Sequence, residues 1–169
     1  SSVAITGAAG VQNSFVNAGD NVSVTATFSE AVIVDNSSGN NPTITLVVGT
    51  DDNRTATYMS GSGSTDLVFQ YTIQATGTSG ENDDNGTSIV ANALALPNGS
   101  TIRDPAGNIA TNLTHSAVSD NSSVKVDTTL PTVSSVAITG AAGVQNSFVN
   151  AGDNVSVTAT FSEAVIVDN

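Results

Sequence analysis

The sequence contains no cysteine, which excludes disulfide bonds and thiolate metal sites as sources of rigidity. It holds three lysines and arginines against 15 aspartates and glutamates, so the formal net charge is -12 at pH 7. Nucleic acids and anionic membranes are bound through basic patches, so we expect neither as a partner. No apolar run approaches the roughly 20 residues of a membrane-spanning helix. Divalent cations are the partners that such an acidic chain favours.

The groups that most catalytic sites require are also scarce. His115 is the only histidine, and no serine stands in a nucleophile-elbow motif. The glycine-rich segments 7–10 and 61–64 are short and lack basic neighbours, so they are typical of turns and not of phosphate-binding loops. We therefore expect no enzymatic activity, and we expect His115 at a surface position.

Threonine, serine, valine, asparagine and glycine are abundant, and this composition favours strands and turns over helices. Apolar and polar residues alternate most clearly from Val22 to Phe28, as in a half-buried strand. The strands predicted in this way cover residues 2–6, 21–28, 43–48, 54–59, 67–74, 88–96 and 122–127. About seven short strands at this spacing predict an all-β, immunoglobulin-like antiparallel β-sandwich.

The apolar positions of these strands define a predicted core. It comprises Val3, Ile5, Val22, Val24, Phe28, Ile44, Leu46, Val48, Tyr58, Leu67, Phe69, Tyr71, Ile73, Ile89, Leu94, Val124 and Val126. A unit of this length can bury such a core without disulfides or a structural metal.

The sequence also repeats itself, because residues 1–36 recur without a change as residues 134–169. This recurrence predicts a tandem repeat, of which the chain holds one complete unit and the start of the next. We expect a domain over residues 1–127, a linker over 128–133, and the first two strands of the next identical repeat over 134–169. Proline at position 131 favours a short, extended linker.

The second copy is too short to bury a core, so alone it is expected to be disordered or to borrow a partner. Because the copies are identical, residues 37–133 can take their first two strands from 1–36, or from 134–169 of the same or another molecule. We favour residues 1–36, which are directly connected. Strand exchange by residues 134–169 in an isolated fragment stays open.

Three motifs, in one order, carry a family resemblance. Residues 18–20 read Ala-Gly-Asp and lead into a strand whose end, residues 27–32, reads Thr-Phe-Ser-Glu-Ala-Val. Residues 104–108 read Asp-Pro-Ala-Gly-Asn, and residues 126–132 read Val-Asp-Thr-Thr-Leu-Pro-Thr. Over the whole unit the chain resembles the bacterial immunoglobulin-like extender repeats of very large surface adhesins. It is most similar to the long repeats-in-toxin (RTX) adhesins of marine Gram-negative bacteria.

This resemblance implies a structural extender, or spacer, that projects distal binding domains from the bacterial cell surface. It implies an extracellular protein exported by type I secretion, with neighbouring identical repeats of the same chain as partners. It also implies calcium ions at and near the domain junctions, which make the array rigid.

Alternating strand direction predicts an acidic group at each end of the sandwich. At the C-terminal end, beside the junction, we expect Asp51, Asp52, Glu81, Asp83, Asp84 and Asp127. At the N-terminal end we expect Glu30 and Asp104, and Glu163 is the copy of Glu30 that the next unit brings to the junction. Calcium takes six to eight oxygen ligands, and residues 80–86, Gly-Glu-Asn-Asp-Asp-Asn-Gly, form the segment richest in them. We therefore predict a calcium-binding function for these residues.

Aspartate is also an ordinary turn residue. We expect that role for the scattered Asp20, Asp35, Asp66 and Asp120. Asp104 is expected to order its own turn with Gly107 and Asn108, with ligation as the alternative. Glu30 closes its predicted strand, where it either ligates an ion or forms hydrogen bonds.

Outward threonine pairs leave a second function open. The pairs Thr25/Thr27, Thr43/Thr45 and Thr55/Thr57 are suited to ordering water, so a ligand-binding unit that contacts glycan or ice through avidity is the alternative. Aromatic residues make up only 4% of the chain, which leaves few for stacking on sugars. Threonine is also a common outward residue of strands, so the extender is preferred.

Overall fold

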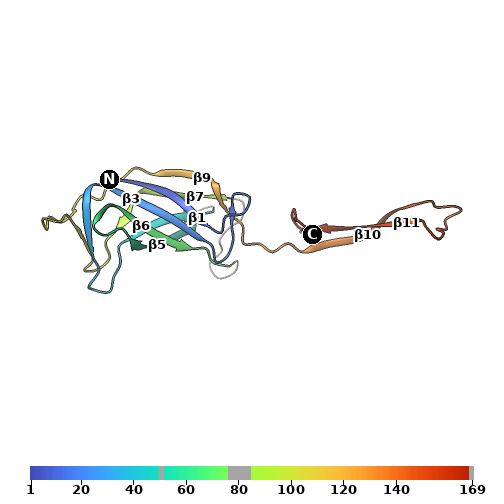
Figure 1. The fold of residues 1–169 in the computed structure, drawn as a ribbon, viewed down its shortest axis with the longest axis horizontal. Coiled ribbons are helices and arrows are strands. Elements are labelled where there is room, and N and C mark those ends of the chain that lie inside the picture. The colour runs from blue at the N-terminus through green and yellow to red at the C-terminus, as the bar shows by residue number, and fades with distance from the viewer. Residues whose placement is uncertain (50–51, 76–84, 168–169) are drawn as a thin grey trace. The chain divides into compact units, whose positions relative to one another are not determined.

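A computed structural model describes residues 1–49, 52–75 and 85–167 (Figure 1). The chain divides into two compact units, Ser1–Thr128 and Thr129–Asn169. All regular elements among the described residues are strands, which confirms the all-β prediction. The first unit contains β1 (Ser2–Ala9), β2 (Phe15–Val16), β3 (Asn21–Asp35), β4 (Thr43–Val48), β5 (Asp52–Ser60), β6 (Ser64–Thr72), β7 (Asn85–Ala95), β8 (Thr101–Arg103) and β9 (Val118–Val126). This described part of the chain includes no helix able to cross a membrane.

The first unit is a β-sandwich. One layer has the order β1-β3-β6-β5 and the other the order β4-β7-β9, and the β4–β5 hairpin joins the two into one continuous ladder. These orders are those of the immunoglobulin fold, as predicted. The short strand β2 pairs in parallel with the end of β9, whereas the other pairs in the unit are antiparallel. In Figure 1, β1 begins at the end of this unit opposite to the end where β9 leaves it.

The core lies between the two layers and follows the predicted alternation. Val22, Val24 and Ala26 of β3 are fully buried, and so are the inward residues of β4. Tyr58 and Phe69 meet edge to face, with ring centroids 6.0 Å apart, a favoured geometry for aromatic pairs. The structure adds buried residues that the sequence prediction omitted, namely Val16, Val32, Ala56, Ala93 and Ile102.

Strand β3 is longer than predicted. Beyond Phe28 it continues to Asp35, because β8 pairs with its last residues, Val34 opposite Ile102. Glu30, which we predicted to close its strand, therefore lies within β3. The prediction of the strand end was wrong because it considered only local alternation, and β8 comes from a distant part of the chain.

Strand β7 contains a large bulge. Ile44 of β4 is opposite Leu94, whereas Leu46, two residues on, is opposite Ile89. Asn92, inside the bulge, has a φ angle of 61°, in the left-handed region that asparagine tolerates. The bulge turns main-chain N–H groups away from the ladder, and these groups need another acceptor.

His115 supplies this acceptor. Its Nε2 accepts the N–H of Ala93 at 2.8 Å and the N–H of Leu94 at 3.3 Å. Its Nδ1 lies 2.8 Å from the carbonyl oxygen of Ser116, which only accepts, so Nδ1 carries the proton and the ring is neutral. With 7% of its surface exposed, His115 is buried, and the prediction of a surface position was wrong.

The second unit is a two-stranded antiparallel sheet of β10 (Val133–Ala142) and β11 (Asn154–Phe161). Its register repeats that of the first copy, with Ser2 opposite Thr27 and Ser135 opposite Thr160. The structure describes this segment as a hairpin whose ladder involves no residue outside the copied segment. Because an isolated two-stranded hairpin is at best marginally stable in water, the expectation that the segment is disordered or borrows a partner stays a prediction.

Candidate functional site

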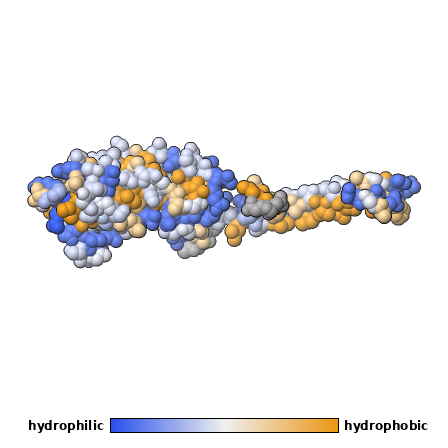
Figure 2. All heavy atoms as spheres, in the orientation of Figure 1, coloured by the Kyte–Doolittle hydropathy of each residue, from blue (hydrophilic) through white to orange (hydrophobic). Residues whose placement is uncertain are grey.

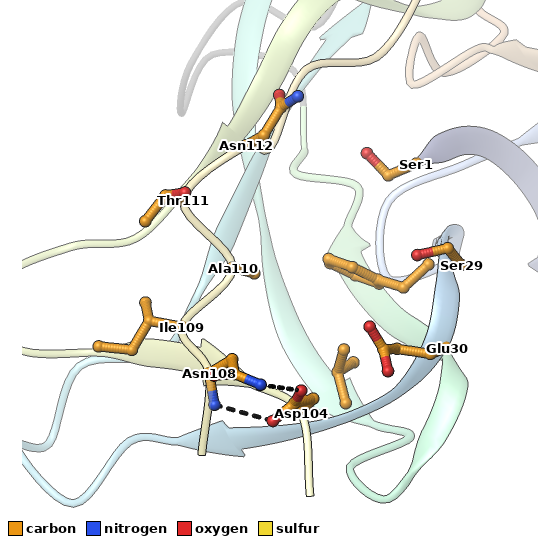
Figure 3. A pocket seen from close by; sticks show the side chains of 11 residues that line it. Ser1, Ser29, Glu30, Asp104, Asn108, Ile109, Ala110, Thr111 and Asn112 are labelled. Atoms are coloured by element: carbon orange, nitrogen blue, oxygen red, sulfur yellow. Dashed lines mark hydrogen bonds between the residues drawn. The ribbon is translucent and has the colours of Figure 1, made fainter. Parts of the chain in front are cut away.

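An open pocket of about 280 Å³ lies at the N-terminal end of the sandwich. Phe28 and Val32 of β3 are among its apolar lining residues. Two predicted site residues, Glu30 and Asp104, line it from different elements (Figure 3). Asp104 follows β8, so the pairing of β3 with β8 brings these two carboxylates to one pocket. Sequence reasoning had assigned both to this end of the unit.

The side chain of Asp104 is engaged in its own turn (Figure 3). Its Oδ1 accepts the main-chain N–H of Asn108 at 2.8 Å, and its Oδ2 accepts the side-chain amide of Asn108 at 2.7 Å. Gly107, with a φ angle of 95°, donates its N–H to the Asp104 carbonyl. The hydrogen bonds from Asn108, first from its side chain and then from its main chain, lower the pKa of the Asp104 carboxyl. Asp104 thus orders the turn between β8 and the segment before β9.

Two carboxylates, those of Glu30 and Asp104, line this pocket, and the carboxylate of Asp104 already accepts two hydrogen bonds. Calcium takes six to eight oxygens, so these two side chains would supply only part of a ligand set. Across the described residues, no three or more histidine, cysteine, aspartate or glutamate side chains are grouped to hold a metal. Ligation of an ion by Glu30 and Asp104 stays a prediction.

At the C-terminal end, the structure places Asp127 directly after β9. Its main-chain N–H donates to the carbonyl of Val16 at 3.0 Å, and the residue is half-buried. Asn85, the first residue of β7, is opposite Val126. The predicted ligands Asp51, Glu81, Asp83 and Asp84 lie outside the described residues, and only the main chain of Asp52 is described. Asp127 is thus the one predicted ligand of this end whose side chain the structure describes.

Glu163, the remaining predicted ligand, belongs to the second unit and lies just beyond β11. Its counterpart Glu30 lies within β3. The two identical sequences thus differ in local structure, because β3 has strand partners beyond Phe28 that β11 does not have in this structure.

Of the four scattered aspartates predicted to be turn residues, only Asp20 follows a turn. Asp35, Asp66 and Asp120 lie within β3, β6 and β9, so the prediction was wrong for these three, because each of these strands extends beyond the segment that alternation predicted. The Oδ2 of Asp20 accepts the N–H of Asn17 at 2.9 Å, and a side chain at Gly10 would collide with the Asp20 carboxylate. The Oδ2 of Asp35 lies 4.0 Å from the Nη1 of Arg103. Hydrogen bonds from Ser37, from its side chain and then its main chain, lower the pKa of Asp35, with a smaller contribution from the charge of Arg103.

The outward threonines line up across strands. Thr43 is opposite Thr57 and Thr45 is opposite Thr55, so four threonines share the outer surface of the β4–β5 hairpin. Thr25 lies instead within hydrogen-bonding distance of Thr6, at 2.8 Å between the hydroxyl oxygens. Cross-strand threonine pairs of this kind stabilise sheets in many proteins.

Fold and site together define a β-sandwich of immunoglobulin-like strand order, with carboxylates at its ends. The chain matches no protein-family model, no curated protein and no solved structure.

Proposed function

We propose that the chain is a piece of a structural extender, in which identical β-sandwich units follow one another and give a bacterial surface adhesin its length. The observation that carries this proposal is the recurrence of residues 1–36 as 134–169, in the same strand register. Repeated units add span without new binding chemistry. A sandwich whose chain enters at one end and leaves at the other suits such an arrangement.

Calcium is the second part of the proposal. We infer that Ca²⁺ makes the array rigid, with Asp127 and the acidic residues of segments 51–52 and 80–86 as its ligands. The net charge of -12 favours cation binding, and close carboxylates repel one another unless a cation lies among them. The support from the described residues is the position of Asp127 at the start of the linker.

A calcium titration of the whole chain tests the second part. An ion that binds only the folded state adds about 2.7 kcal/mol at a free concentration 100 times its Kd, which corresponds to a rise in Tm of roughly 10 °C for a domain of this size. We expect Asp127→Asn to reduce the rise. We expect the matched control Asp66→Asn, an exposed residue of β6, to preserve it. Melting curves that are the same in calcium and in chelator contradict the calcium proposal and leave the fold intact.

The extender itself is tested with two complete units joined by the natural linker. We expect small-angle scattering to give a maximum dimension near twice that of one unit, and a narrower distribution of shapes with calcium. A compact particle, with the two units folded against each other, contradicts the extender.

The alternative is a ligand-binding unit that acts through avidity. It rests on the four threonines of the β4–β5 hairpin, which share one outer surface. Binding of a single unit to ice or to a glycan array, abolished by Thr45→Lys, supports this alternative over the extender. Exposed Thr65→Lys, on β6, is its control.

A further inference from the structure

Thr132, near the end of the expected linker, is hydrogen-bonded to the strand pair that follows it. Its N–H donates to the hydroxyl oxygen of Ser162 at 2.9 Å, and its carbonyl accepts the N–H of Ser162 at 2.8 Å. The next residue, Val133, begins β10 and lies opposite Phe161 of β11. Thr132 and Ser162 thus continue the ladder of β10 and β11 into the linker.

One acceptor in this pair is a side chain. In a regular antiparallel pair of the hydrogen-bonded type, both N–H groups donate to main-chain carbonyls. Here the Ser162 hydroxyl replaces one of the carbonyls, close to a register shift between Val133 and Ser135. Because such a shift turns main-chain groups out of line, the N–H of Thr132 relies on a side chain at position 162 that carries an acceptor.

Hydrogen bonds, and not apolar burial, hold this pair. The neighbouring residues Val133 and Phe161 are 57% and 37% exposed. Figure 2 shows apolar residues along much of the visible side of this hairpin. The loss of the bond to the Ser162 hydroxyl therefore removes a large part of what fixes Thr132.

The first unit shows that the same pair fits a longer strand with more partners. Ser29, the counterpart of Ser162, lies within β3. β6 is opposite β3 at Thr27 and again at Val32, with a register shift between them, and β8 is opposite β3 only from Ile33 on. Among the strand pairs that the structure describes, neither β6 nor β8 thus takes up the position of Ser29.

Hydrogen bonds therefore act on the linker from both of its ends. Asp127 donates its N–H to the carbonyl of Val16 at 3.0 Å, and Thr132 is bonded to Ser162. Pro131, directly before Thr132, has a restricted φ angle and favours an extended conformation of Leu130. The residues from Leu130 to Thr132 are thus held in one direction relative to the strands that they enter.

We propose that Ser162 is a positioning residue for the junction, whose hydroxyl fixes the end of the linker to the following unit without calcium. In an array, the copy of this serine in each unit has the same role for the linker that precedes that unit. The inference rests on the extender proposal, because a fixed linker has a function only where units follow one another. It assigns part of the rigidity to the protein chain itself, in addition to the part assigned to calcium.

Amide hydrogen exchange at Thr132 tests this proposal in two complete units joined by the natural linker, with a chelator present throughout. We expect Ser162→Ala to raise the exchange rate of this amide roughly 2- to 13-fold, the range that corresponds to one net hydrogen bond. Ser162→Thr keeps a hydroxyl and is expected to retain slow exchange. The control is Ser156→Ala, at an exposed serine of β11, which we expect to leave the rate unchanged.

Each other outcome overturns the proposal. An unchanged rate in Ser162→Ala, or a Thr132 amide that only calcium protects, shows that the serine does not fix the linker. Equal effects of Ser162→Ala and Ser156→Ala show a general loosening of the strand, and fast exchange in Ser162→Thr shows that the hydroxyl is not the acceptor. Small-angle scattering of the same protein separates the two proposals. A compact particle in which Ser162 still protects the Thr132 amide contradicts the extender and supports the role of Ser162.

Discussion

A single valine, present in both copies, gives the sharpest test of which copy completes the sandwich. Val24 is fully buried between the layers, and Val157, the same residue of the second copy, is 61% exposed. Val24→Ala removes two methyl groups, at about 0.8 kcal/mol each, and leaves a small cavity, so the cost is about 2–3 kcal/mol. Val157→Ala removes the same atoms from an exposed site and costs less than about 0.5 kcal/mol.

These free energies translate into a clear difference in thermal melting. For a unit of the size of Ser1–Thr128, a loss of 1 kcal/mol lowers Tm by roughly 4 °C. We therefore expect Val24→Ala to lower Tm by roughly 8–12 °C and Val157→Ala by less than about 2 °C, measured on the whole chain by far-UV circular dichroism. If the two variants lose equal stability, or if Val157→Ala loses more, then residues 1–36 are not the segment that packs against the core.

Two further predictions concern polar groups at the ends of the sandwich. His115→Ala leaves the N–H of Ala93 buried without an acceptor, so we expect it to lower the free energy of unfolding, measured in urea, by about 1–3 kcal/mol. An unchanged midpoint of the urea transition would show that water replaces the imidazole. The pKa values of Asp104 and Asp35 are lowered below 3.8 in the folded chain, so their stabilisation is complete above that pH and is lost as the pH falls through the folded values. We therefore expect Tm to decline below about pH 4. We expect a smaller decline in Asp104→Asn, which has no carboxylate to protonate at this turn. An equal decline in that variant would contradict the proposal that the Asp104 carboxylate stabilises the turn.

Alternation was sufficient to predict the long strands and most of the core. In the segments from Val22 to Phe28 and from Thr43 to Val48, the inward face is apolar and the outward face is mostly hydroxylic, so burial of the apolar face favours a strand. The short strands β2 and β8 gave no such signal, because two or three residues contain no period. Their existence depends on partners far along the chain, β9 and β3.

The error at His115 has a recognisable origin. Alternation from Ile89 makes Ala93 an inward residue, yet Leu94, its direct neighbour, is buried as well. Two adjacent inward residues indicate a break in the pleat, and the break exposes N–H groups that a nearby side chain must satisfy. The sequence therefore contained a sign of the bulge, but not the identity of the acceptor.

Of the predicted site, the structure brings together only Glu30 and Asp104 among the described side chains. Their shared location followed from strand direction alone. The engagement of Asp104 by Asn108 was expected from the turn motif, whereas the pairing of β3 with β8 that brings Glu30 beside it was not. Local motifs predict local hydrogen bonds, and they carry no information on the pairing of distant strands.

The parallel pairing of β2 with β9 determines how the unit responds to a pulling force. Lys125 donates its N–H to the Ser14 carbonyl, and Asp127 donates to Val16, so the first and last parts of the unit are joined directly. Tension between the two ends slides these strands along each other, and the hydrogen bonds are loaded together instead of opening one after another. Resistance to forced unfolding is a matter of unfolding rate and not of equilibrium stability. This two-residue strand thus joins the first and last parts of the unit along the line on which a pulling force would act.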